Sequence, residues 1–101
     1  MIKVTYQAQK RNILHINITG HARSVEPGEN DLVCAGASSV IFGILNSLNP
    51  KFIDIVIKEN EVDLKSKQIN SREQILLTAL LTSLTTIQNN YGKYIQIKEE
   101  E

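Results

Sequence analysis

The chain has 101 residues, 42% of them hydrophobic, and its eleven Lys and Arg residues are balanced by eleven Asp and Glu residues. This length and apolar content suit one domain with one hydrophobic core, so we predict a single domain over residues 1–101. The formal charge of zero disfavours direct binding to RNA or DNA, because nucleic-acid binders carry a basic excess that neutralises phosphates.

The first ten residues, MIKVTYQAQK, alternate between apolar and polar and lack the continuous apolar core of a secretory signal. The longest apolar runs, such as VIFGIL, are too short to span a bilayer. A single cysteine cannot form an internal disulfide, which agrees with a reducing compartment. We therefore expect a cytoplasmic protein that does not bind membranes.

The N-terminal residues predict a β-hairpin. Ile2, Val4 and Tyr6 share one face of the first strand, and the period of two resumes after the polar KRN turn at Leu14, Ile16 and Ile18. His15 alternates with these apolar residues, so it is expected on the polar face beside Asn17, in a structural role.

Gly20 ends the second strand, and the polar tract that follows contains Pro27 and Gly28. Few apolar residues anchor this tract, which predicts a mobile active-site loop over residues 22–33. Helical spacing of apolar residues then runs from about Leu32 to Leu48, and Asn49-Pro50 ends it. Gly43 lies inside this helix, where we expect it to permit close packing.

The second half of the chain predicts a second hairpin, a second helix and a last strand. Ile53, Ile55 and Ile57 alternate before a polar turn near Glu59-Asn60 and a shorter second run. Ser71 and Gln74 form a capping-box pattern that begins an amphipathic helix, and KYIQIK supplies a last strand. The predicted fold class is α+β, a mixed sheet of about five strands with two main helices in the order β-β-α-β-β-α-β.

Cys34, the chain's one cysteine, falls near the start of the first predicted helix. In the first turn of a helix, free backbone N–H groups and the positive end of the dipole favour thiolate over thiol. The same N–H groups can stabilise the oxyanion that forms when a thiolate attacks an amide carbonyl. This position predicts a nucleophile.

A thiolate nucleophile needs a general acid that protonates the departing amine, and His21 fits because an imidazole titrates near neutrality. His21 follows the second strand and can meet Cys34 if the helix start packs beside that strand end. Asp31 could orient His21 or act as a helix cap, and Ser38 lies one turn beyond Cys34. We treat Asp31 and Ser38 as possible supporting residues.

Structural interpretations of the same residues stay open. Cys34 between Val33 and Ala35 could be a small buried hydrophobic residue, His21 an exposed turn residue and Ser38 a surface residue. One cysteine and two histidines do not provide the usual four ligands of a zinc site, and the glycines match no dinucleotide or phosphate-binding pattern. We expect neither a metal nor a cofactor.

Four segments carry a resemblance to a known family: GHA, DLVCAGAS after a polar loop, SVIFGILNSL and the late TALLTSLTTIQNNY. Together they resemble the bacterial ribosomal-processing cysteine protease Prp family over nearly the whole chain. The resemblance implies a cytoplasmic homodimeric peptidase that removes a short N-terminal extension from the precursor of large-subunit ribosomal protein twenty-seven. It implies that Cys34 is the nucleophile, that His21 is the general acid/base and that Asp31 supports them. It also implies an apolar substrate tail with aromatic residues just before the cut.

Two other functions remain open. A non-enzymatic ribosome-assembly factor would bind a ribosomal protein precursor without cutting it, and the neutral charge suits a protein-binding module equally well. A thiol redox sensor would need a resolving thiol from another chain, because this chain has one cysteine.

Overall fold

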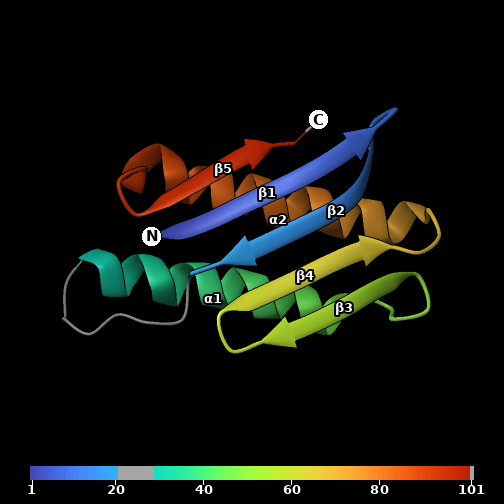
Figure 1. Cartoon of the computed structure of the whole chain (residues 1–101), viewed down its shortest axis with the longest axis horizontal. Coiled ribbons are helices and arrows are strands. Elements are labelled where there is room, and N and C mark those ends of the chain that lie inside the picture. The colour runs from blue at the N-terminus through green and yellow to red at the C-terminus, as the bar shows by residue number, and fades with distance from the viewer. Residues whose placement is uncertain (21–28, 101) are drawn as a thin grey trace.

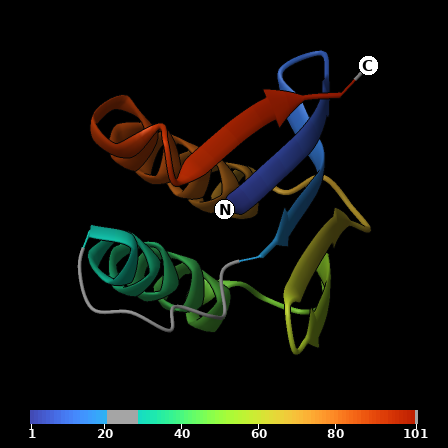
Figure 2. The same cartoon turned by 60° about the vertical axis from the view of Figure 1, so that its left-hand side comes forward.

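The computed structural model describes residues 1–20 and 29–100, and the side chains of residues 29–31 lie outside this description. The described chain forms strands β1 (Ile2–Gln9), β2 (Asn12–Thr19), β3 (Ile53–Lys58), β4 (Glu61–Ser66) and β5 (Ile95–Glu99) and helices α1 (Glu29–Ser47) and α2 (Ser71–Tyr91). One sheet in the order β3-β4-β2-β1-β5 carries both helices on the same face (Figures 1 and 2).

The sheet is mixed. Strand β1 is antiparallel to β2, β2 to β4, and β4 to β3, whereas β5 lies parallel to β1. The two hairpins account for the antiparallel neighbours β1-β2 and β3-β4, and α2 returns the chain so that β5 adds at the free edge of β1. The predicted α+β class and element order are confirmed.

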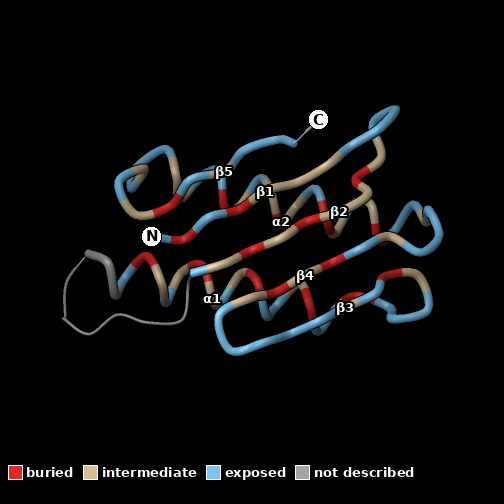
Figure 3. Tube along the Cα trace, in the orientation of Figure 1, coloured by how far each residue is buried: buried red, intermediate tan, exposed pale blue. Residues whose placement is uncertain are grey.

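The hydrophobic core fills the space between the sheet and the two helices. The buried positions recur every second residue on the strands and every three or four residues on the helices, which gives each element one apolar face. In Figure 3 the buried stretches, drawn in red, recur along the strands and along both helices. Helix α1 contributes Val33, Ala37, Ile41 and Leu45, and helix α2 contributes Leu77, Leu80 and Leu84.

A β-bulge in the first hairpin changes the predicted inner face. The register moves from Gln7 opposite His15 to Ala8 opposite Ile13, so Leu14 is the extra residue on β2. Ile13 is therefore buried, and Leu14 is only half-buried. The strict alternation over Leu14, Ile16 and Ile18 is wrong at Leu14, because an extra residue reverses the face of every residue before it.

Helix α1 begins three residues earlier than the apolar spacing indicated. It starts at Glu29, so residues 29–33 of the predicted 22–33 loop are helical, while residues 22–28 lie outside the described residues. The first helical turn contains Glu29 and Asp31, residue types that the positive end of a helix dipole favours. The extension was missed because these polar residues carry no apolar periodicity.

Helix α2 is capped by a different residue from the one predicted. Asn70 has an extended backbone, and its side chain accepts hydrogen bonds from the N–H groups of Arg72 and Glu73. The Ser71–Gln74 capping box is therefore wrong. Gln74 Oε1 instead accepts from Ile13 N–H at 2.7 Å, and Gln74 Nε2 donates to Ile13 O at 3.0 Å.

Gly43 does not serve close packing. In the part of the chain that the structure describes, and apart from the neighbouring residues and backbone of α1 itself, no atom lies within 4 Å of a Cβ placed on Gly43, and the residue is exposed on α1. The expectation that this glycine lets another element approach is wrong.

Candidate functional site

Cys34 lies at the border between the core and the solvent. It belongs to the second turn of α1, is half-buried, and packs against the core cluster beside the buried Val33. Ala37, three residues later, is fully buried and fixes this part of the helix against the core. Cys34 is thus held by rigid structure and still has an accessible side, which a buried structural cysteine would lack.

The early start of α1 alters the predicted electrostatics of Cys34. In a helix that begins at residue 29, the helical residues whose N–H groups have no partner within the helix are the first three, residues 29–31. The expected place of Cys34 in the first turn is therefore wrong, and its own N–H belongs to the internal helical ladder. The Cα–Cβ bond of a helical residue tilts toward the N-terminus, so the thiol points back toward the first turn.

Asp31, Cys34 and Ser38 occupy one flank of α1. They are spaced by three and four residues in a continuous helix, which aligns them on neighbouring turns. Ser38 is half-buried, as Cys34 is. Asp31 falls inside the first helical turn and therefore does not precede the helix as a cap would, and its side chain lies outside the described part of the chain.

His21 lies outside the described residues, and the structure fixes the residue before it. Gly20 has a φ of +81°, and its N–H donates to Asn60 O at 3.1 Å. A Cβ at Gly20 would collide with the carbonyl oxygen of Met1.

The role of Gly20 was missed, because the sequence indicated only that this glycine ends a strand. Its positive φ and its contact with the Met1 carbonyl both require the absence of a side chain. The sequence signal was a glycine between an apolar strand and a histidine, but this signal did not indicate that the Met1 carbonyl lies against Gly20.

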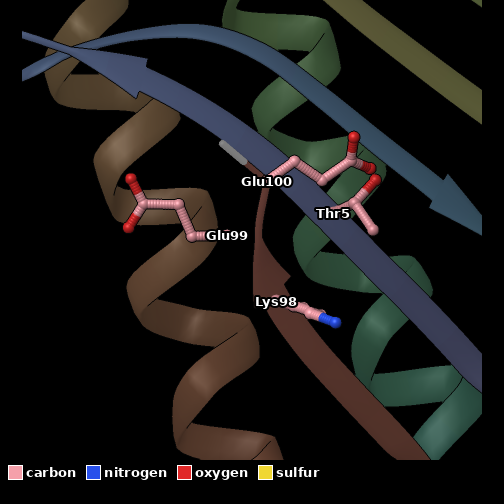
Figure 4. Close-up of a pocket in the computed structure, with 4 residues that line it drawn as sticks. All are labelled: Thr5, Lys98, Glu99 and Glu100. Atoms are coloured by element: carbon pink, nitrogen blue, oxygen red, sulfur yellow. The ribbon is translucent and has the colours of Figure 1, made fainter.

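A shallow depression lies elsewhere, at the end of β5 beside the middle of β1. It is lined by Thr5, Lys98, Glu99 and Glu100, and Figure 4 shows Glu99 turned away from the other three. These polar side chains include no cysteine or histidine, so the depression offers no cysteine chemistry. Within the described chain, no cluster of three or more His, Cys, Asp or Glu residues could hold a metal, and no helix is long and apolar enough to cross a membrane.

His15 belongs to a polar cluster on the open face of the sheet. Its Nε2 lies 2.6 Å from Asp63 Oδ1, and Asn17 Nδ2 donates to the same oxygen at 2.8 Å. Burial acts to raise the pKa of Asp63, but the hydrogen bonds from Asn17 and His15 outweigh it and lower that pKa below its usual value. This placement agrees with the structural role expected for His15.

Glu73 is a buried carboxylate that links the two helices, and no sequence pattern had indicated its burial. It is 1% exposed, accepts from Asn49 N–H at 3.0 Å and pairs with Arg72 at 2.8 Å. Arg72 also donates to the carbonyl of Ser47 at the end of α1. These bonds tie the C-terminus of α1 to the first turn of α2, far from Cys34 along the helix.

Comparison with known proteins points to one family. The family profile described as "Cysteine protease Prp" matches residues 1–96. A relative named ribosomal processing cysteine protease Prp from Staphylococcus aureus strain Mu50 is 35% identical over 91 residues, covering 84% of this chain and 85% of the relative. The protein of the same name from Bacillus subtilis strain 168 is 29% identical over 111 residues, covering 96% of each.

Solved structures agree. The S. aureus processing protease Prp in complex with a substrate peptide superposes with a TM-score of 0.86 at 29% identity, covering 99% of this chain and all of that one. The same protease with a covalently linked product peptide gives a TM-score of 0.84 at 31% identity, with the same coverage.

Proposed function

The chain belongs to the cysteine protease Prp family, and we propose that it removes the N-terminal extension of a ribosomal protein by nucleophilic attack from Cys34. The family match covers residues 1–96, and it makes the chain a cysteine protease. The observation that carries the assignment of the nucleophile is the position of the chain's single cysteine, half-buried on a rigid helix with an accessible side.

The proposed reaction has two halves. The Cys34 thiolate attacks the carbonyl carbon of the scissile peptide bond, and the carbonyl oxygen becomes an oxyanion. The C–N bond then breaks, the amine leaves with a proton from the His21 imidazolium, and the acyl group remains on Cys34 as a thioester. Water attacks the thioester and His21 takes a proton from it, and the C–S bond then breaks, which releases the carboxylic acid product and restores the Cys34 thiolate beside the His21 imidazolium.

Asp31 and Ser38 enter this proposal as supporting residues. Both lie on the flank of α1 that carries Cys34, one turn before and one turn after it. Asp31 would orient the imidazole of His21, and Ser38 would contact the peptide or the oxyanion. Free N–H groups at residues 29–31 are further candidate oxyanion donors, since a helical cysteine points toward them.

The proposed substrate is the precursor of large-subunit ribosomal protein twenty-seven. The S. aureus and B. subtilis relatives are named ribosomal processing proteases, and the S. aureus structure contains a substrate peptide. We propose further that this chain acts in the cytoplasm, where ribosomal proteins are synthesised, and that it works as a homodimer.

The test is to incubate the purified protein with the same organism's precursor and to determine the new N-terminus by mass spectrometry. We expect one cut near the N-terminus with the wild-type protein and no cut with Cys34→Ala or Cys34→Ser, because a hydroxyl is a much weaker nucleophile at neutral pH. His21→Ala should lose most of the activity, whereas His15→Ala, on the open sheet face, should retain it.

Two results would redirect the proposal. Tight binding of the precursor without cleavage by the wild-type protein would favour the non-enzymatic assembly factor. Loss of cleavage in His15→Ala with full activity in His21→Ala would show that the wrong histidine had been chosen, although the nucleophile would be unaffected. Circular dichroism of each variant separates these outcomes from loss of folding.

A further inference from the structure

The turn between β1 and β2 is built from two residues that this kind of turn disfavours. Gln9 pairs with Asn12, so Lys10 and Arg11 form a two-residue turn. Their φ angles are +51° and +69°, left-handed values that a type I′ turn requires at both positions and that Asn-Gly adopts most easily. Left-handed backbone is strained for a residue with a Cβ. Two basic side chains thus occupy this turn at a cost to stability, which points to a role outside the fold.

More cations gather at the end of the sheet that carries this turn. Strands β1 and β4 end there and β2 and β3 begin there, because each strand is antiparallel to its neighbour. Ser66 Oγ donates to the carbonyl of Ile13 at 2.8 Å, and Lys67 N–H donates to the carbonyl of Phe52 at 2.8 Å. In Figure 1 this end of the sheet lies opposite the start of α1. We call its four cations the basic end: Lys10, Arg11, Lys51 and Lys67.

The cations of the basic end are exposed, and none of them forms an ion pair with a described carboxylate. The acidic C-terminus lies further along β1. Glu100 N–H donates to the carbonyl of Tyr6 at 2.7 Å, and Tyr6 precedes Lys10 by four residues, about 13 Å at the rise of a strand. The positive charge of the basic end is therefore available to a partner.

The other carboxylates at this end already face cations. Glu73 is 1% exposed and pairs with Arg72 at 2.8 Å. Asp54 stands opposite Lys65 in the pairing of β3 with β4, and opposite charges in such cross-strand positions attract each other. These acids are matched by cations outside the basic end, so they do not cancel its charge.

The turn between β3 and β4, at the opposite end of the sheet, carries the other sign. It contains Glu59 and leads into Glu61, whose Oε1 lies 3.9 Å from Lys58 Nζ. Gly20 N–H donates to the carbonyl of Asn60, so this acidic turn lies where β2 ends. The formal charge of zero therefore conceals a basic end and an acidic turn at opposite ends of the sheet. The expectation against RNA binding rested on the net charge, whereas a partner responds to the local field.

We propose that the basic end binds the phosphate backbone of RNA and so docks the protease on an assembling ribosomal subunit. The inference rests on the ribosomal protein substrate proposed above, because such a protein is itself bound to RNA in the subunit. One guanidinium and three ammonium groups bond phosphate oxygens by charge-assisted hydrogen bonds, without regard to base sequence. Cys34 belongs to the second turn of α1, which starts at the opposite end (Figure 1), so the docked protein leaves the nucleophile open to the peptide.

The test measures binding of a fluorescently labelled RNA hairpin by fluorescence anisotropy at several salt concentrations. The wild-type affinity should fall as salt rises, because cations that contact phosphates release counterions. Lys10→Gln with Arg11→Gln should weaken binding roughly tenfold or more and lower the salt slope by about two, because two phosphate contacts are lost. The matched control, Lys3→Gln with Lys93→Gln, makes the same change in net charge at exposed positions outside the basic end and should bind as the wild type does.

A second double variant separates RNA binding from folding. Lys10→Asn with Arg11→Gly installs the residues that a type I′ turn prefers, so it should raise the thermal unfolding temperature and still weaken RNA binding.

Three results would overturn the proposal. They are no RNA binding by the wild-type protein at low salt, an equal loss of binding in the matched control, and competition by polyglutamate as strong as that by unlabelled RNA, which would favour an acidic protein as the partner. The measurement uses no cleavage, so failure of the proteolysis assay leaves its result intact, and a lack of RNA binding leaves the proposed cleavage intact.

Discussion

At the scale of single residues, Gly20 directs the chain from β2 into the segment that contains His21. Its φ of +81° costs a residue with a Cβ about 1–2 kcal/mol, and the Met1 carbonyl occupies the place where that Cβ would lie. The glycine of the GHA motif therefore has a structural reason that is separate from the chemistry of the histidine beside it.

Two glycine substitutions should have opposite effects on stability. Gly20→Ala should lower the free energy of unfolding by more than about 2 kcal/mol, because strain and a collision with Met1 act together. Gly43→Ala should raise it by up to about 1 kcal/mol, because the site is an open helix position where alanine is preferred. Urea denaturation of both variants and the wild type measures these changes. Equal effects would contradict the different roles given to Gly20 and Gly43.

Asp63 predicts a dependence of stability on pH. Hydrogen bonds from Asn17 and His15 overcome the effect of burial and lower its pKa in the folded protein, so the ionised form stabilises the fold. That stabilisation is present above the unfolded-state pKa of about 3.9 and is lost as the pH falls through the folded-state pKa. Asp63→Asn should therefore reduce the loss of stability between about pH 5 and pH 3, measured by urea denaturation.

A second variant, Asn17→Ala, tests the hydrogen bond to Asp63 while leaving the carboxylate of Asp63 in place. Asn17→Ala removes the amide that donates to Asp63 Oδ1, so it should raise the pKa of Asp63 and also shrink the loss of stability at low pH. An unchanged pH dependence in both variants would show that this cluster does not contribute to acid stability.

At the scale of elements, helix α2 completes the sheet with a side chain. The pairing of β2 with β4 ends at His15, and beyond it the N–H and C=O of Ile13 have no strand partner on that side. Gln74 supplies both an acceptor and a donor, and Ser66 Oγ also donates to the carbonyl of Ile13 at 2.8 Å. An amide side chain thus takes the place of a peptide group next to the bulge.

Removal of that amide should be costly. In Gln74→Ala, Ser66 still satisfies the Ile13 carbonyl, but the Ile13 N–H loses its partner in a partly buried place. We expect a loss of about 1–3 kcal/mol in the free energy of unfolding. Asn70→Ala should cost about 1 kcal/mol through loss of the helix cap, and Ser71→Ala should cost little. A larger loss in Ser71→Ala than in Asn70→Ala would restore the capping-box interpretation.

Sequence periodicity predicted each element, but it did not predict which side chain caps a helix or bonds a distant backbone group. The capping box failed because Asn70 offers a better placed oxygen and Gln74 finds a backbone partner sixty-one residues away in sequence. The start of α1 was missed because polar residues continue a helix without apolar spacing. Local patterns contain no information on such distant partners.

At the scale of the whole molecule, the element order restricted the topology strongly. Two hairpins and two helices with one apolar face each require a sheet covered on one side, and that is the observed arrangement. The strand order was not predictable, because it depends on the pairing of β2 with β4, which joins the two halves of the chain. Cys34 as a candidate nucleophile came from residue type and motif, and its half-buried placement required the structure.

The central claim is that Cys34 carries the acyl group during peptide cleavage. The most direct measurement is intact-mass spectrometry of the protein, quenched in acid shortly after mixing with the precursor peptide, followed by digestion that locates any adduct. We predict an added mass equal to that of the N-terminal product less one water, attached to Cys34 and absent in Cys34→Ala. Cleavage at the wild-type rate by Cys34→Ala, or an adduct on another residue, would contradict the claim.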